Sequence, residues 1–296
     1  MTTARHEPSG AVIDNYIYVL GGQNGSGGYL NSVERAAINS DATLGSWQTV
    51  SSMLTARRGL AATSSGGYLY ALGGYDSHHN SLDSVERAAV NADGTLGAWQ
   101  PASAMNHRRA GLGAVSVRGY LYALGGYDNQ SSLNIVERAM INTDGSLGSW
   151  QIMNAMSKTR NDVATATVGG YIYALGGYGT GLLTTVEWTP ISPASLNSLS
   201  PSAASSNQPT TITINGTNLL PTPTLQLGGA TTLTTSFVST TTLTTTVPSG
   251  LTSGWYTATL TNGDGHVATL TNALRVDGTG PAAGGLTING GALNSS

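Results

Sequence analysis

The sequence contains no cysteine, a single lysine (Lys158) and few charged residues, which make up 9% of its 296 positions. Without cysteine the chain can form no disulfide, zinc–thiolate site or catalytic thiol, and nothing in it indicates a redox compartment. A net charge of −3 provides no basic patch for the phosphates of nucleic acid. No apolar run approaches the length of a membrane-spanning helix, so we expect no membrane insertion. The first five residues do not resemble a secretion signal.

A pair of glycines follows an aromatic and aliphatic run at four places in the first two thirds of the chain. The first glycine of each pair falls at 21, 73, 125 and 176, which gives spacings of 52, 52 and 51 residues. An arginine, a Val-Glu-Arg or Val-Glu-Trp tripeptide and, in three repeats, a tryptophan recur at the same period. A fixed period near fifty, built from short β-rich segments, predicts a propeller or a solenoid.

The second repeat shows four predicted strands. Gly59–Thr63 is small and apolar, which suits the crowded innermost strand around a propeller axis. Tyr68–Leu72 is apolar on both faces and should be buried on both. Ser84–Val90 is the third strand, and the turn at 91–94 leads into a fourth strand that carries Trp99. Four antiparallel strands of this kind make one propeller blade.

These residues resemble the kelch family, which combines a double glycine after an aromatic and aliphatic strand, Val-Glu-Arg, a tryptophan and then Met-x-x-x-Arg. The resemblance covers residues 1–190 and implies kelch-type propeller blades. Because the four landmarks recur in register, an unrelated glycine-rich β protein is a poor alternative. Kelch propellers usually contain more than four blades.

The fourth repeat is incomplete, whereas the repeats at 5–52, 57–104 and 109–155 are complete. Thr189–Pro193 replaces the turn and the tryptophan-bearing strand. The chain also begins at a methionine that aligns with Met53, Met105 and Met156, which leaves two interpretations: a start in mid-array, or a true start codon that falls in register. We expect an open arc with an exposed face at each end, completed by further blades upstream or by a second copy.

The composition changes after Pro190, because only Asp264, Arg275 and Asp277 are charged between Ile191 and Ser296. We interpret Ser195–Gln208 as a linker. Strands with alternating Thr and apolar residues are predicted at 211–216, 224–228, 232–238, 242–247, 255–261 and 267–276, which fits a half-buried β-sandwich. Ile214–Leu219, Val247–Leu251 and Gly254–Thr257 resemble an immunoglobulin-like TIG (IPT) domain, which implies a sandwich over 191–277. Residues 278–296 resemble a linker and the start of a further sandwich.

The sequence offers little chemistry for catalysis or metal binding. A galactose-oxidase-type copper site needs a Tyr–Cys crosslink, and cysteine is absent. Asp41, Asp93 and Asp144 precede the tryptophans by six residues, whereas sialidase-like turns need five, so we interpret them as turn formers. His78-His79 has no third ligand nearby, and we expect a solvated loop. The sequence therefore predicts no metal site and no cofactor.

The resemblance to kelch domains that bind protein segments implies a cup on one propeller face. Its lining comes from the arginine, or its neighbour, before each innermost strand and from the residue after each double glycine. These positions are Arg5, Arg57, Arg58, Arg109 and Arg160, with Gln23, Tyr75, Tyr127 and Tyr178. Guanidinium and tyrosine groups suit acidic peptides or carbohydrates. The recurring arginines have a second possible role, which is to brace each blade; we also predict that Glu34, Glu86, Glu137 and Glu187 pair with them or with free N–H groups.

Two classes of function remain. The first is a non-enzymatic binding or adhesion module of an extracellular or cell-surface protein, which recognises protein segments or glycans on the propeller face. The second is a carbohydrate-active enzyme that resembles kelch-type sialic-acid mutarotases. That enzyme would need paired carboxylates in the axial mouth, and the repeat offers no non-repeating Glu or Asp there. A scaffold without a ligand is the third possibility.

Overall fold

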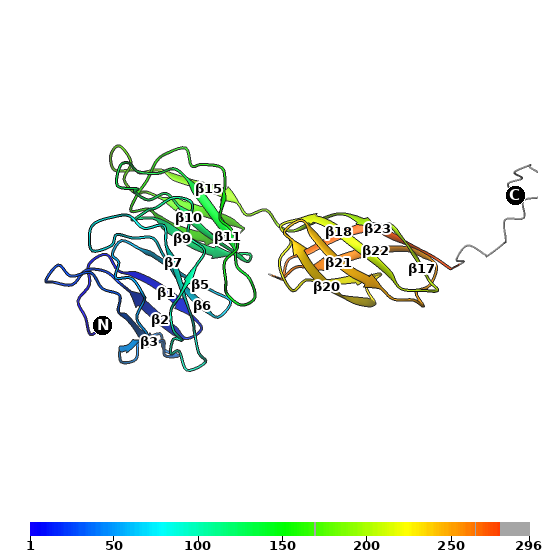
Figure 1. The fold of residues 1–296 in the computed structure, drawn as a ribbon, viewed down its shortest axis with the longest axis horizontal. Coiled ribbons are helices and arrows are strands. Elements are labelled where there is room, and N and C mark those ends of the chain that lie inside the picture. Colours follow the sequence, from blue (N-terminus) through cyan, green and yellow to red (C-terminus); the bar gives the residue numbers. More distant parts are fainter. Residues whose placement is uncertain (169, 264, 279–296) are drawn as a thin grey trace, which may run out of the picture. The chain divides into compact units, whose positions relative to one another are not determined.

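The computed structural model describes residues 1–168, 170–263 and 265–278, and these form two compact units, one ending at Ser192 and the other beginning at Pro193. All its elements in the described residues are β-strands (Figure 1). This confirms the predicted all-β class. The described residues contain no helix long and apolar enough to cross a membrane.

The first unit contains four antiparallel blades whose strands follow one another in chain order. The strands of the first blade are β1 (Ser9–Ile13), β2 (Tyr16–Leu20), β3 (Val33–Ala37) and β4 (Gln48–Val50). Those of the second are β5 (Ala61–Ser65), β6 (Tyr68–Leu72), β7 (Val85–Ala89) and β8 (Gln100–Ala102). Those of the third are β9 (Gly113–Val117), β10 (Tyr120–Leu124), β11 (Val136–Met140) and β12 (Gln151–Ile152). The fourth blade has β13 (Ala164–Val168), β14 (Tyr171–Leu175) and β15 (Val186–Pro190).

The predicted strand order holds in each blade, with one local difference. Trp99 and Trp150 lie directly before β8 and β12 and not on them. Their indole rings pack into the preceding blade, where each Nε1–H donates to a backbone carbonyl, of Ser51 and of Ser103. The tryptophan therefore connects neighbouring blades from a position just before the last strand of its own blade.

The fourth blade has three strands in the described part of the chain, as the missing turn and tryptophan predicted. Its strands are more exposed than those of the inner blades: β10 is buried at all five positions, whereas β14 is buried at two. Hydrophobic clusters join the first blade to the second and the second to the third. The innermost strands lie side by side in the order β1, β5, β9 and β13. Leu44 on the first blade and Leu175 and Val186 on the fourth are exposed, so the array is an open arc.

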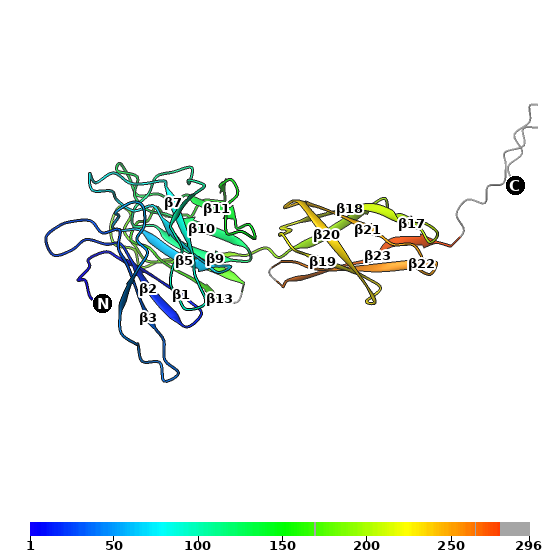
Figure 2. The same ribbon diagram turned by 60° about the horizontal axis from the view of Figure 1, so that its bottom comes forward.

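The second unit is a sandwich of two sheets. Its strands are β16 (Ser195–Ser200), β17 (Ala203–Ser205), β18 (Thr210–Thr217), β19 (Thr224–Leu227), β20 (Thr231–Ser239), β21 (Thr242–Val247), β22 (Gly254–Thr261) and β23 (Val267–Asp277). One layer contains β16, β18 and β21, and the other contains β19, β22 and β23 (Figure 2). The short strand β17 pairs with β23. The long strand β20 pairs with β19 through its first half and with β21 through its second half.

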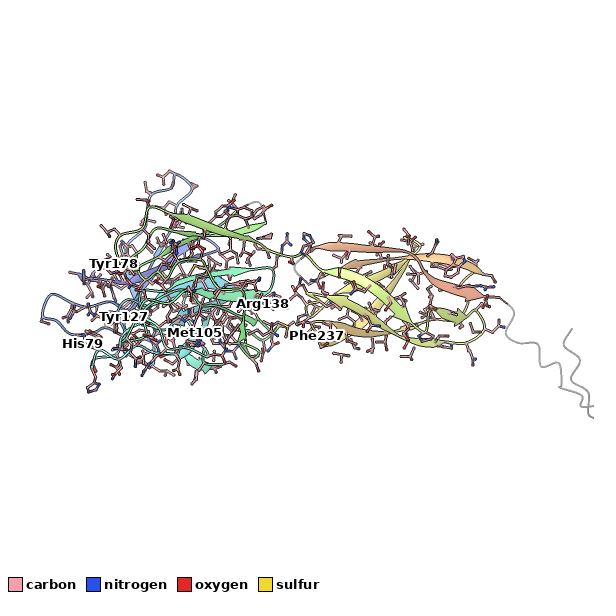
Figure 3. All side chains as sticks on the ribbon, turned by 90° about the horizontal axis from the view of Figure 1, so that it is seen from above. His79, Met105, Tyr127, Arg138, Tyr178 and Phe237 are labelled. Atoms are coloured by element: carbon pink, nitrogen blue, oxygen red, sulfur yellow. The ribbon has the colours of Figure 1, made fainter. Side chains whose placement is uncertain are left out.

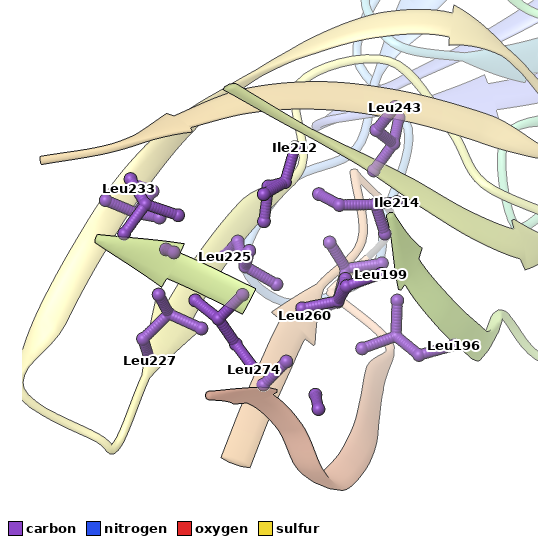
Figure 4. Packing of buried hydrophobic residues seen from close by; sticks show 14 of the residues in the cluster. Leu196, Leu199, Ile212, Ile214, Leu225, Leu227, Leu233, Leu243, Leu260 and Leu274 are labelled. Carbon is purple, nitrogen blue, oxygen red and sulfur yellow. The ribbon is translucent and has the colours of Figure 1, made fainter. Parts of the chain in front are cut away.

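The core of the sandwich is aliphatic and lies between the two layers (Figure 4). Ile212, Ile214, Leu225 and Leu260 are fully buried there. The predicted linker at 195–208 is wrong, because β16 and β17 lie in it. Leu196, Leu199 and Ala204 are too sparse among Ser, Asn and Pro to show a strand period, yet all three are buried. Of the predicted start of a further sandwich, 278–296, all but Gly278 lies outside the described residues.

Candidate site at the mouth of the blade array

A cavity of about 320 Å³ opens at one end of the innermost strands, and all four blades contribute to it. Its lining is polar and comes from the turns that lead into those strands and from the segments that follow the double glycines. The residues are Glu7, Arg58, Gly59, Tyr75, Ala110, Gly111, Tyr127, Asn161 and Asp162.

A row of backbone hydrogen bonds connects the four blades at this mouth. The Gly59 N–H donates to the Glu7 carbonyl at 3.0 Å, the Gly111 N–H to the Gly59 carbonyl at 2.8 Å, and the Asp162 N–H to the Gly111 carbonyl at 2.7 Å. All four residues occupy the same place in their repeats and have positive φ, between 49° and 59°. Glycine takes this conformation easily, so Glu7 and Asp162 replace glycine at a conformationally costly position.

Glu7 and Asp162 correct the prediction that the mouth holds no non-repeating carboxylate. Both belong to the end blades, while the inner blades carry Gly59 and Gly111 at these positions. The signal was present in the sequence. The residue two places after each repeated arginine reads Glu, Gly, Gly and Asp, and only a comparison of the four repeats at that position shows it.

Arg58 is the one predicted arginine that lines this cavity. Its Nη1 donates to Glu7 Oε2 at 3.1 Å, and its Nε donates to the Tyr29 hydroxyl at 2.7 Å. The guanidinium carbon also lies 5.5 Å from the centroid of the Tyr75 ring, within cation–π range. These contacts hold Arg58 in place and neutralise much of the charge of Glu7.

Asp162 has no such partner. Its backbone is bonded to Gly111, but its carboxylate makes no hydrogen bond or ion pair with the described residues. A Cβ placed on Gly111 would lie 2.5 Å from Asp162 Oδ1, so glycine is needed there for the carboxylate to fit. The residue as a whole is exposed, but burial of its carboxyl against the cavity wall, and then the negative charge of Glu7, raise the pKa of Asp162. A cationic hydrogen-bond donor from a ligand would offset both the burial of the Asp162 carboxylate and its repulsion by Glu7.

The four repeated arginines lie elsewhere, inside the blades. The side chains of Arg5, Arg57, Arg109 and Arg160 are 0% exposed. In each blade, Nη1 donates to the carbonyl of the first glycine of the pair, at 2.7–2.8 Å, and Nη2 binds the glutamate of the Val-Glu tripeptide. The structure therefore gives them the bracing role and not a place in the cup.

The glutamate prediction is confirmed in all four blades. Besides the arginine, each carboxylate accepts two backbone N–H groups from the Met-x-x-x-Arg segment, for example those of Leu54 and Thr55 on Glu86. In the first blade, burial opposes ionisation of Glu34, but Arg5 and the N–H groups of Thr2 and Thr3 outweigh it and lower the pKa of Glu34 to about 2. The pKa values of Glu137 and Glu187 are lowered as well, again against burial, chiefly by the neighbouring arginine and backbone N–H groups.

The residues that follow the double glycines divide into two pairs. Tyr75 and Tyr127 line the cavity, whereas Gln23 and Tyr178, from the end blades, do not. Gln23 donates to the Gly27 carbonyl, and the Tyr178 side chain is exposed. Tyr127, Tyr178 and His79 lie toward one end of the blades and Arg138 toward the other (Figure 3).

No metal site is formed by the residues that the structure describes, since nowhere do three or more His, Asp or Glu side chains gather. His78 and His79 are exposed, and His79 Nδ1 is 2.8 Å from the Tyr29 hydroxyl. Asp41, Asp93 and Asp144 form turns as predicted, because each accepts the N–H and the hydroxyl of the residue two places on. A second hollow of about 410 Å³, in the sandwich, is lined by threonines, Ser236, Leu233 and Pro248, without a titratable group.

Comparison with known proteins agrees with both resemblances. Residues 4–35, 56–87 and 108–138 match the Kelch motif, and residues 194–276 match the IPT/TIG domain. The chain is 32% identical over 117 residues (40% of its length) to Kelch-like protein 26 of Mus musculus and 38% identical over 109 residues (37%) to Kelch-like ECH-associated protein 1B of Danio rerio. It is 22% identical over 184 residues (62%) to Kelch repeat and BTB domain-containing protein 1 of cowpox virus. The aligned parts span 18%, 18% and 31% of these relatives.

The chain thus carries Kelch repeats in a four-blade propeller arrangement, followed by an IPT/TIG domain. Kelch propellers generally mediate protein binding.

Proposed function

We propose that this Kelch and IPT/TIG protein is a non-enzymatic binding module whose cavity takes a basic side chain from a segment of another protein. The carboxylate of Asp162, unpartnered at the rim of a cavity with two tyrosine rings, carries this proposal. A lysine or arginine would pair with Asp162 and stack against Tyr75 or Tyr127.

The charge of the cavity supports a basic ligand and disfavours an acidic one. The lining contains Glu7, Asp162 and Arg58, and Arg58 is already paired with Glu7. Because the four bracing arginines are buried, they offer no charge to an acidic peptide. We therefore propose a basic peptide as the ligand, in place of the acidic peptide that the sequence favoured.

The protein is proposed to act outside the cell or at its surface, with the sandwich as a spacer. The support is compositional: one lysine, no cysteine and Thr/Ser/Gly/Asn-rich β-domains in tandem. Protease treatment of intact producing cells tests this part, since an intracellular chain would survive the treatment.

The test of the ligand is a peptide array and a glycan array probed with the 296-residue protein. We expect retention on peptides that contain Lys or Arg, with Asp162→Asn and Tyr127→Ala each weakening it at least tenfold. The matched control is Arg138→Ala, which removes a side chain from the opposite end of the blades (Figure 3). Retention on acidic peptides or glycans alone, or equal retention by Asp162→Asn, would contradict the proposal.

A carbohydrate-active enzyme is the second candidate, because Glu7 and Asp162 do form a carboxylate pair at the mouth. The raised pKa of Asp162 suits a proton donor, and Glu7 would be the base. Against it, Glu7 is occupied by Arg58. Magnetisation-exchange NMR of reducing sugars with the protein separates the two candidates: faster exchange between anomers that is lost in Asp162→Asn would favour the enzyme.

A further inference from the structure

The two uncovered end faces of the arc carry the two halves of the joint that connects its inner blades. At the joint between the first and second blades and at that between the second and third, three side chains of the later blade pack into the earlier one: a methionine, a leucine and the tryptophan. Met53, Leu96 and Trp99 do this at the first joint, where they pack in one cluster with Leu20 and Val33 of the first blade.

On the first blade the three corresponding residues, Met1, Leu44 and Trp47, are more exposed than at the inner joints. Met1 is 55% exposed whereas Met53 is 2% exposed, and Leu44 is 46% exposed whereas Leu96 is 9% exposed. Trp47 is half-buried, and its indole N–H lacks the carbonyl partner that Trp99 and Trp150 find in the preceding blade.

On the fourth blade the receiving residues are uncovered in the same way. Val186 is 52% exposed whereas its counterpart Val33 is 0% exposed, and Leu175 is exposed where Leu20 is fully buried. The fourth blade thus presents an empty socket, and the first blade presents the side chains that fill such a socket.

Backbone groups at the two faces are complementary too. At each inner joint the second glycine of a pair donates its N–H to the carbonyl of the next blade's arginine, at 2.8–2.9 Å, and that arginine's N–H donates to a leucine carbonyl of the earlier blade. In the arc, the Gly177 N–H and the Leu183 carbonyl of the fourth blade make neither bond, and nor do the N–H and carbonyl of Arg5.

Gly176 shows that the socket is shaped for another blade. A Cβ at Gly21, Gly73 or Gly125 would lie 2.3–2.4 Å from the arginine carbonyl of the next blade, so glycine there admits the close approach. At Gly176 the nearest atom is 3.5 Å away and belongs to the same blade. The space that an arginine carbonyl fills at the other three positions is open.

We propose that the occupant is a second copy of this chain, with the first blade of each copy seated on the fourth blade of the other. This head-to-tail contact, made twice, closes a ring of eight blades, at the upper end of the usual four to eight in propellers. The first blade of another copy is the natural occupant because it carries the unpaired Arg5 backbone, Leu44 and Trp47 that the socket lacks. The inference does not depend on the ligand of the cavity.

The oligomeric state of the 296-residue protein is the first test. Sedimentation equilibrium over a dilution series should give twice the mass of the chain. Leu44→Arg, on the inserting face, and Val186→Arg, on the receiving face, should each reduce it to one copy. Val238→Arg, at an exposed position of the sandwich, is the control and should leave the dimer unchanged. A monomeric wild-type protein would overturn the proposal.

Mixing the two variants reveals the direction of the contact. A head-to-tail joint can form between the intact socket of Leu44→Arg and the intact inserting face of Val186→Arg, so the mixture should regain dimers that neither variant forms alone. A mixture that remains monomeric would contradict a head-to-tail joint.

An introduced disulfide tests the register, since the chain has no other cysteine. Thr63 Oγ1 on the second blade lies 3.3 Å from Ser116 Oγ on the third. The corresponding positions of the proposed joint are Ala166 on the fourth blade and Val12 on the first. The double variant Val12→Cys/Ala166→Cys should oxidise to a covalent dimer, and neither single variant should. An intramolecular disulfide, a ladder of polymers or no crosslink would overturn the two-copy ring.

Discussion

The propeller arc and the sandwich are both all-β, but they stabilise their buried backbone in different ways. The arc holds an arginine–glutamate pair in every blade, and Arg57, Arg109 and Arg160 are among its largest fully buried side chains. The sandwich has two buried polar residues in its described part, Thr245 and Asn262, and neither is charged. The difference follows from how the chain leaves each sheet.

In the arc the chain turns away after each second strand at the double glycine, which leaves carbonyls outside the sheet ladder. In the second blade the Arg57 guanidinium, which has five donors, satisfies two carbonyls and Glu86. Glu86 in turn satisfies two N–H groups of the segment that leads into the same blade. In the sandwich, Asn262 does a smaller task of the same kind, accepting from the Leu220 N–H and donating to the Asn218 carbonyl. The arc thus uses a charged Arg–Glu pair in each of its four blades, whereas the sandwich uses the neutral amide of Asn262 at one place.

Low pH should produce the largest difference in stability between the two units. The folded-state pKa of Glu34 is about 2, and those of Glu137 and Glu187 are lowered in the same direction. Because these values lie below the ordinary 4.5, the stabilisation is complete above pH 4.5 and is lost as the pH falls from 4.5 toward 2. Hydrogen exchange should show the arc opening in this window.

The sandwich is the internal control for the acid experiment. Its described residues hold no buried ion pair, since Arg275 and Asp277 are both largely exposed. Protection of β18 and β21 should therefore persist at a pH where protection of β6 and β10 is lost. Equal loss in both units would show that the braces are not the acid-sensitive element.

Removing one brace should destabilise the arc by a smaller amount. Glu86→Ala leaves Arg57 buried without its counter-ion and two N–H groups without an acceptor, so we expect a cost of about 3–5 kcal/mol. Urea unfolding followed by tryptophan fluorescence measures it. Glu187→Ala in the fourth blade is the matched variant; its carboxylate is already 21% exposed, so water can replace part of the contacts and the cost should be lower.

In the sandwich a comparable loss requires an aliphatic side chain. Ile212 is 0% exposed in the core between the two sheets, and Ile212→Ala should cost about 2–5 kcal/mol through lost burial and a residual cavity. Thr246→Ala, on the adjacent strand β21, should change little because Thr246 is exposed. Differential scanning calorimetry should show the transition of the sandwich move while that of the arc stays.

The repeats made most of the fold predictable, because four copies in register reveal which positions the blade needs. The Arg–Glu pairs could be predicted since both residues recur at a fixed period. Glu7 and Asp162 escaped for the opposite reason: they break the repeat at a position where the inner blades hold glycine. β16 and β17 were missed because their few buried residues, Leu196, Leu199 and Ala204, show no period. A repeat thus predicts structure well and conceals the sites that depart from it.

The smallest predicted effect compares an inner joint with the last one. Arg87 Nη1 donates to the Asp144 carbonyl of the following blade, and its guanidinium carbon lies 5.2 Å from the centroid of the Tyr68 ring. Arg138 lies over the Tyr120 ring in the same way, at 4.3 Å. It reaches no carbonyl in the described part of the fourth blade, because that blade lacks the corresponding turn. Arg87→Ala should therefore cost about 1 kcal/mol more than Arg138→Ala, the value of one hydrogen bond. Urea midpoints of the two variants measure the difference. Equal midpoints would mean that the turn carbonyl of Asp144 adds nothing to the joint between the second and third blades, where Leu147 and Trp150 are buried.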